Sequence, residues 1–278
     1  MIQIENLCFS YSRKQMLFDQ LSVQLPAGNI YGLLGKNGAG KSTLLYLITG
    51  LLFPKKGSVD VMHFEPKNRA PQFLREIYLV TEEFSLPSMK MERFVSLYSP
   101  FYPRFNHSLL DEYLNEFNLP RDKKLTDLSY GQKKNFLLSF GLATDCRLLI
   151  LDEPTNGLDI PSKSQFRKIV ANAIHEERSF IISTHQVRDM ENLIDPIIIL
   201  DEGKIVFHQS IEKISEKLTF SRQTQAPDNS TVVYSESSLT GYSVVRQNTS
   251  MTETNISLEM LFNAVISNTH RITEIFNS

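Results

Sequence analysis

The sequence predicts an α/β fold built around a parallel sheet. Short apolar runs of strand length are separated by segments in which apolar residues recur at helical spacing. Near-continuous apolar runs are typical of strands that a parallel sheet buries on both faces. The chain has 278 residues, 41% of them hydrophobic, which is enough for one or two domains with packed cores. The strand-like runs are residues 30–34, 148–151, 180–183 and 197–200.

Composition narrows the classes of function. Lys and Arg number 29 against 31 for Asp and Glu, so the net charge of −2 offers no electrostatic footprint for nucleic acid. Cys8 and Cys146 form no CxxC pair, which favours two buried thiols over a disulfide framework or a zinc site. The N-terminus lacks an export-signal pattern, and no apolar run reaches the roughly 18 residues that span a bilayer. We therefore expect a chain that is neither secreted nor membrane-spanning.

The strand-like run at residues 30–34 leads into a phosphate-binding loop. Residues 35–42, GKNGAGKS, fit the pattern GxxxxGK[ST] and precede the helical pattern STLLYLITGLL. Glycines let backbone N–H groups surround an anion, and the helix N-terminus adds partial positive charge. Lys41 supplies a charge to the β- and γ-phosphates, and Ser42 a hydroxyl ligand for Mg²⁺. The predicted nucleotide-binding residues are Gly35, Lys36, Asn37, Gly38, Ala39, Gly40, Lys41, Ser42 and Thr43.

Two competing interpretations of this loop are weaker. A glycine-rich turn before a helix does not need Lys41 and Ser42 at its end. A dinucleotide fingerprint needs a third small residue at position 43, which is Thr43, and an acidic ribose partner at the end of a βαβ unit. The triphosphate loop is the preferred interpretation.

Another strand ends in two carboxylates. In LLILDE, residues 148–153, Asp152 stands where ligands bind at the carboxyl edge of a parallel sheet. We expect Asp152 to hold Mg²⁺ through water and Glu153 to polarise the attacking water beside the γ-phosphate. The alternative is a surface turn that begins with Asp-Glu, which the following PTNGLD makes weaker.

In residues 87–146, apolar residues recur at helical spacing and no strand-like run occurs. This pattern predicts a helical subdomain inserted into the α/β core. Within it, Ser129 and Gln132 have the spacing of a capping box that starts a helix. A capping box does not explain Gly131, because glycine there costs helix stability unless something approaches the backbone. A phosphate at that helix N-terminus would supply the reason.

The composition shifts again after residue 209, so we expect two domains, residues 1–210 and a small α+β extension at 211–278. The extension would hold a charged helix-like segment, a polar run at 221–230, two short strands and a closing helix. The strands are expected at residues 231–236 and 242–247. The helix is marked by Leu258, Leu261, Phe262 and Val265.

Four motifs in this order resemble one protein family. GKNGAGKST, LSYGQKK, LLILDEPTNGLD and STHQ together resemble the ATP-binding cassette (ABC) ATPases over residues 1 to about 210. Their joint occurrence is far more specific than any one motif. The resemblance implies a P-loop NTPase core of the ABC type with N-terminal antiparallel strands and the helical subdomain already noted. It also implies ATP and Mg²⁺ as cofactors.

The resemblance gives roles to further residues. Tyr11 matches the aromatic residue that stacks on adenine, and His185, after the strand FIIST, matches the histidine that contacts the γ-phosphate. Glu153 and His185 are thus the expected catalytic residues. Asp159 matches the loop that crosses to a partner cassette.

The signature segment, residues 128–132 (LSYGQ), has one departure from the family pattern. The resemblance implies that Ser129, Gly131 and Gln132 act on the ATP held by the other subunit of a head-to-tail dimer. Tyr130 stands where glycine is commonest. Tyrosine at position 130 should have little effect on phosphate contact, because Ser129 and Gly131 are the residues that would touch phosphate.

A second departure follows the strand-like IYLV of residues 77–80. The family usually has a glutamine there that ligands Mg²⁺ and senses the transmembrane partner. This chain has TEEF, with Glu82 the expected match and Glu83 the alternative. Because a carboxylate can also ligate Mg²⁺, the expected metal ligands are Ser42, Asp152 and Glu82.

The function implied by the resemblance is the ATP-hydrolysing subunit of an ABC membrane transporter. Its expected partners are a second cassette, either a copy or a paralogue, and polytopic transmembrane permease subunits. Its expected place is the cytoplasmic face of the cell membrane. The single short cassette, the FYPRF segment at residues 101–105 and the poor match at the glutamine position look most like bacterial antibiotic or drug exporters.

Two other functions stay open. A soluble ABC ATPase in translation or DNA repair is disfavoured, because the chain has one cassette and no coiled-coil insertion. A nucleotide-binding regulator without turnover is opposed by an intact set of Lys41, Asp152, Glu153 and His185.

Overall fold

A six-stranded sheet forms the centre of the structure, a computed structural model that describes residues 1–12, 15–228, 232–250 and 252–277. Across the sheet, the strands are β5 (Ile77–Val80), β6 (Leu148–Asp152), β7 (Ser179–Thr184), β3 (Ile30–Leu34), β8 (Ile197–Asp201) and β9 (Lys204–Gln209). The first five are parallel, and β9 pairs antiparallel with β8. The predicted α/β fold with a parallel sheet is confirmed.

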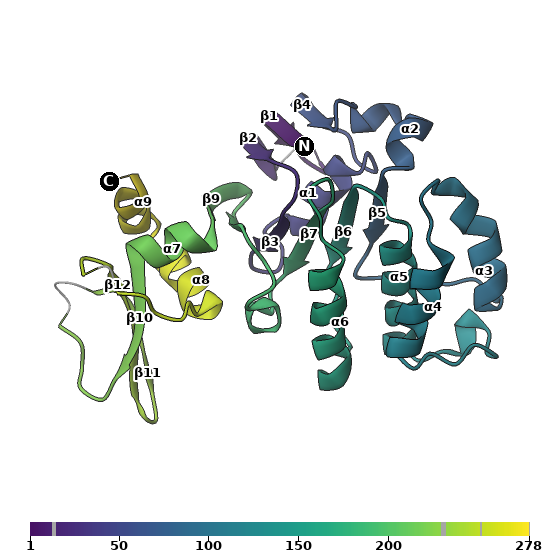
Figure 1. Ribbon diagram of the computed structural model, residues 1–278. Coiled ribbons are helices and arrows are strands. Elements are labelled where there is room, and N and C mark those ends of the chain that lie inside the picture. The colour runs from purple at the N-terminus through teal and green to yellow at the C-terminus, as the bar shows by residue number, and fades with distance from the viewer. Residues whose placement is uncertain (13–14, 229–231, 251, 278) are drawn as a thin grey trace.

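Burial on both faces explains the near-continuous apolar sequences of these strands. In β6, Leu149 and Leu151 enter one hydrophobic cluster, whereas Leu148 and Ile150 enter the cluster on the other face. Helix α6 (Ile160–Asn172) contributes to the first cluster, and α1 (Lys41–Ile48) contributes to the second. The sheet is therefore the middle layer between two apolar cores (Figure 1).

The N-terminal strands form a separate antiparallel sheet, as expected. Its strands are β2 (Phe18–Leu25), β1 (Ile2–Phe9) and β4 (Lys56–Val61), in that order. Their buried residues join α1 in the second cluster. The short helices η1 (Pro66–Asn68) and α2 (Pro71–Leu74) then lead into β5.

The expected helical subdomain lies beyond β5, at one end of the central sheet (Figure 1). Its elements are α3 (Met91–Tyr98), η2 (Ser99–Phe101), α4 (His107–Glu116), η3 (Leu125–Asp127) and α5 (Tyr130–Ala143). Aromatic rings fill its core, since Phe94 meets Phe136 and Phe140 edge-on at centroid distances of 5.3 Å. One long helix, α5, thus connects this core with the central sheet.

The C-terminal residues form a small α+β unit at the opposite end of the sheet (Figure 1). Its elements are α7 (Ile211–Lys217), β10 (Leu218–Gln223), β11 (Val232–Ser238), β12 (Gly241–Gln247), α8 (Leu258–Ser267) and α9 (Thr269–Asn277). Its antiparallel sheet has the order β10-β12-β11. The two expected strands and the closing helix are confirmed within the described residues, and residue 231, at the start of the first expected strand, lies outside them.

The polar run at 221–230 begins inside a strand. Residues 221–223 belong to β10, which pairs along its whole length with β12, and residues 229–230 lie outside the described part of the chain. Polar side chains suit this strand because Ser221 and Arg222 are exposed. Helix α9 was also not expected.

A continuous hydrophobic cluster crosses residue 210. Ile214, Val245 and Leu261 of the C-terminal unit share it with Met190 and Ile194 of the cassette. The division into residues 1–210 and 211–278 stays a prediction, but the two parts pack on a common core.

Candidate nucleotide site

Three loops meet at the carboxyl edge of the central sheet. Leu34 at the end of β3 pairs with Thr184 at the end of β7, and Asp152 at the end of β6 pairs with Ser183. The residues that follow these strand ends are the phosphate loop, Glu153 and His185. Parallel pairing therefore brings together residues that are far apart in the sequence.

The phosphate loop bends through a left-handed glycine before α1. Gly40 has φ +107°, a conformation that L side chains rarely adopt. The next residue, Lys41, is almost fully buried, and its Nζ donates to the carbonyl oxygens of Gly35 at 2.8 Å and Lys36 at 3.4 Å. The loop thus encloses the ammonium at the N-terminus of a helix, which is the arrangement expected of a phosphate cradle.

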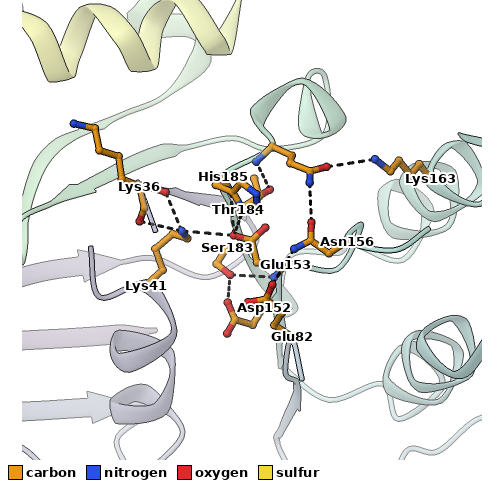
Figure 2. Close-up of polar contacts among 12 residues, drawn as sticks. Lys36, Lys41, Glu82, Asp152, Glu153, Asn156, Lys163, Ser183, Thr184 and His185 are labelled. Carbon is orange, nitrogen blue, oxygen red and sulfur yellow. Dashed lines mark hydrogen bonds and ion pairs between the residues drawn. The ribbon is translucent and has the colours of Figure 1, made fainter. Parts of the chain in front are cut away.

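Glu153 lies between this ammonium and His185 (Figure 2). Its Oε1 is 3.5 Å from Lys41 Nζ and 2.8 Å from His185 Nδ1, and it also accepts the His185 backbone N–H at 3.0 Å. Its second oxygen, Oε2, is buried and has no hydrogen-bond partner among the described residues. A carboxylate held by one oxygen can use the other to orient a water molecule.

Asp152 is oriented by Ser183, whose hydroxyl donates to Asp152 Oδ1. The same hydroxyl accepts the backbone N–H of Glu153 at 3.2 Å. In the described residues no group of three or more His, Cys, Asp or Glu side chains could hold a metal. Mg²⁺ bound to a nucleotide commonly takes only one or two protein oxygens beside phosphate oxygens and water, so the Ser42 hydroxyl and the Asp152 carboxylate fit as its ligands.

A buried lysine that the sequence did not single out completes the site. Lys134 of α5 is fully buried, and its Nζ donates to the carbonyl oxygen of Glu153 and, at 3.3 Å, to that of Asn156. Burial lowers the pKa of Lys134 from 10.5 to about 8. Lys134 lies three and four residues before Leu137 and Leu138, and this helical spacing from two apolar residues is a sequence signal that could have revealed its burial.

Tyr11 leaves its ring open at the edge of the phosphate loop. The side chain is 68% exposed, although its hydroxyl lies 2.9 Å from the Thr43 hydroxyl and its ring packs edge-on against Phe9. The hydroxyl contacts Thr43 of α1, and most of the side chain is exposed to solvent. This geometry suits a base that stacks on the ring.

The signature segment forms the predicted capping box. Ser129 Oγ accepts the backbone N–H of Gln132 at 3.2 Å, and Gln132 Oε1 accepts that of Ser129 at 3.0 Å. A Cβ on Gly131 would lie 3.2 Å from the carbonyl oxygen of Gly157. The group that approaches the Gly131 backbone in this structure is therefore the Gly157 carbonyl, in the chain's own loop after β6. Contact between Gly131 and a phosphate stays a prediction.

The segment after β5 is tied to two neighbouring loops. Glu82 Oε1 accepts from Asn156 Nδ2 at 2.9 Å, and the Glu82 carbonyl accepts from the Tyr130 hydroxyl at 2.8 Å. Asn156 Oδ1 in turn accepts from Gln186 Nε2 at 2.9 Å. One carboxylate oxygen of Glu82 thus contacts the side chain of Asn156 in the loop after β6 (Figure 2). The role of Glu82 as a metal ligand stays a prediction. Sequence reasoning missed Asn156 and Gln186.

Asp159 caps the N-terminus of α6. Its carboxylate accepts the backbone N–H of Ser162 at 2.9 Å, and hydrogen bonding to Ser162 lowers the pKa of Asp159. The role of Asp159 at an interface between cassettes stays a prediction, but its helix-capping role follows directly from the contact.

No helix in the described residues is both long enough and apolar enough to cross a bilayer.

Known proteins are similar to this chain in sequence and in fold. Residues 18–156 match the family described as ABC transporter. The chain is 32% identical over 215 residues to the lantibiotic transport ATP-binding protein SrtF of Streptococcus pyogenes, a match that covers 76% of this chain and 92% of that protein. It is 30% identical over 223 residues to the molybdate import ATP-binding protein MolC of Haemophilus influenzae, covering 78% and 86%.

A solved structure with the same fold is a dimeric, post-hydrolysis ATP-binding cassette bound to ADP and Pi. The TM-score is 0.66 at 20% identity, and the match covers 76% of this chain and 99% of that one. This likeness supports the fold, while the sequence matches carry the family. The chain belongs to the ATP-binding proteins of the ABC transporter family and is an ATPase of that type.

Proposed function

We propose that the chain hydrolyses ATP in a head-to-tail dimer of cassettes and thereby drives transmembrane subunits of an exporter. One observation carries the proposal. Lys41 Nζ and His185 Nδ1 both lie against Glu153 Oε1, at 3.5 Å and 2.8 Å. A phosphate-binding lysine, a buried carboxylate and a histidine thus share one small volume at the mouth of the phosphate loop.

The residues divide the chemistry among them. The loop backbone and Lys41 bind the β- and γ-phosphates, so that negative charge developing on the γ-phosphate is stabilised by preorganised groups. Glu153, held by His185, uses its second oxygen to orient and polarise the attacking water. Mg²⁺ held by Ser42 and Asp152 would neutralise phosphate charge when bound.

The dimer is proposed from the position of the signature segment. Ser129 and Gly131 lie at the N-terminus of α5, where a helix favours anions. Lys41 lies at the carboxyl edge of the central sheet, on a different element. Two cassettes packed head to tail would place the signature of one opposite the phosphate loop of the other.

The transmembrane partner and the direction of transport are proposed from the cassette's organisation. The FYPRF segment at residues 101–105 and the poor match at the glutamine position resemble exporter cassettes. Export from the cytoplasmic face of the membrane fits these features. Transport measured in inside-out and right-side-out vesicles that contain the complete transporter would distinguish export from import.

The proposed activity is tested by phosphate release from Mg²⁺-ATP. We expect turnover by the parent chain and a loss of about 10²-fold or more in Lys41→Ala, because this variant removes a charge from the phosphate cradle. Lys56→Ala is the matched control, since Lys56 is exposed on β4 and is not part of the phosphate loop. Equal turnover by the Lys41→Ala variant and the parent would contradict the proposal.

The membrane role is tested separately. Co-purification with a polytopic membrane protein supports the transporter subunit. Sedimentation with ribosomes would instead favour the alternative of a soluble ABC ATPase in translation.

A further inference from the structure

Lys134 is an ionisable side chain buried inside α5. Its side chain has no exposed surface, and a charged group in such a place is costly unless its N–H groups find acceptors. Two of its hydrogens reach the carbonyl oxygens of Glu153 and Asn156, and its Nζ lies 5.7 Å from the ring centroid of Tyr130. A leucine or methionine would fill the same volume at lower cost, so the ammonium points to a task beyond packing.

That task concerns the backbone of Glu153, which has φ +48°. A glutamate in this left-handed region is strained and persists only where its surroundings hold it. The Glu153 N–H donates to the Ser183 carbonyl at 3.0 Å, and its carbonyl accepts from Lys134. The strand β7 thus fixes one side of the residue and α5 fixes the other.

The same helix carries the signature at its N-terminus. Ser129 caps α5, and Lys134 lies little more than one helical turn further along. In the proposed dimer, the signature would contact the ATP of the partner subunit, while Lys134 holds Glu153 of its own subunit. A rigid helix would therefore connect the two ATP sites through one buried side chain.

We infer that Lys134 is a positioning residue that holds Glu153 in its productive conformation and couples it to the signature helix of the same subunit. The inference rests on the proposed function. It assigns Lys134 no contact with ATP, so its loss affects turnover and not nucleotide affinity.

The test compares Lys134→Met, which keeps the volume and removes the donors, with Lys134→Arg, which can donate to both carbonyls. Lys168→Met is the matched control, because Lys168 is exposed on α6. We expect Lys134→Met to lower kcat by about 10- to 10²-fold with KM and Kd for ATP unchanged. Lys134→Arg should restore a large part of kcat, and Lys168→Met should match the parent.

Parental turnover by Lys134→Met, or an equal loss of kcat and ATP affinity, would overturn the inference. If Lys134→Met is unfolded by circular dichroism, Lys134→Gln supplies the same kcat and affinity comparison, with an amide that donates to one carbonyl in place of the ammonium. Failure of the parent itself to hydrolyse ATP would contradict the proposed function instead. The two failures are therefore distinguishable.

Discussion

The phenol of Tyr130 donates a hydrogen bond to the backbone carbonyl of Glu82 at 2.8 Å. These residues are the two places at which the sequence departs from the ABC family pattern, and the structure brings them into contact. The Tyr130 ring also stacks on Phe84 with a centroid distance of 5.2 Å and an interplanar angle of 23°. The aromatic residue in the signature thus holds the segment that follows β5 against α5.

This contact predicts energetic coupling between Tyr130 and Phe84. In a double-mutant cycle of Tyr130→Ala and Phe84→Ala, the coupling in the free energy of unfolding should be about 0.5–1.5 kcal/mol. Urea unfolding of the parent, both single variants and the double variant measures it. Tyr130→Phe is the control, since it keeps the stack and removes only the hydroxyl. Strictly additive effects would show that the two rings do not cooperate.

Glu82→Gln should retain ATPase activity. The contact that the structure shows is a hydrogen bond from Asn156 Nδ2 to Glu82 Oε1, and the amide oxygen of glutamine accepts it equally well. Glutamine is also the usual family residue at this position. Steady-state phosphate release checks the prediction, and a complete loss of turnover would mean that the carboxylate itself is required.

Tyr11→Ala should weaken ATP binding. Stacking of a base on an aromatic ring contributes about 1–3 kcal/mol, which corresponds to a roughly 5- to 150-fold rise in Kd for ATP. Tyr11→Phe, which keeps the ring but loses the contact with Thr43, should bind ATP nearly as the parent does. Titration calorimetry of the two variants decides the matter, and an unchanged Kd in Tyr11→Ala would place adenine elsewhere.

The lowered pKa of Lys134 should make the free energy of unfolding rise with pH between about 8 and 10.5. Its pKa is lowered by burial to about 8, so in this window the unfolded chain binds a proton that the folded chain does not. The contribution to the free energy of unfolding is on the order of 3 kcal/mol across the window. Burial raises the pKa of Cys146, which acts in the opposite sense, so the comparison must be made against a variant.

The Lys134→Met variant isolates this effect. We expect the free energy of unfolding, measured in urea at pH 8 and pH 10, to rise more with pH in the parent than in the variant. Identical changes in both proteins would show that the Lys134 ammonium is not destabilised by burial.

Local sequence patterns predicted much of the fold and of the site. The strand β6 is apolar because both of its faces are buried. The glycine-rich loop that leads to Lys41 has a residue pattern that few structures other than phosphate-binding sites require. The capping box of Ser129 and Gln132 depends on residues three apart, so its spacing alone sufficed.

Contacts between distant segments could not be predicted in this way. Lys134 is buried by a loop that follows a different strand, and Gly131 meets the carbonyl of Gly157 only after the chain has folded. The strand β10 has polar residues in its second half because Ser221 and Arg222, which point to opposite faces of the strand, are both exposed. Its pairing with β12 determines its conformation more than its own propensity does.

The rate of ATP hydrolysis by Glu153→Gln tests the central claim most directly. Glutamine keeps the shape of Glu153 but cannot accept a proton from water, so kcat should fall by roughly 10²- to 10⁴-fold while the Kd for ATP stays unchanged. Steady-state phosphate release, with ATP binding measured in parallel, gives both quantities. Hydrolysis at the parental rate would contradict the assignment of Glu153 as the residue that activates water.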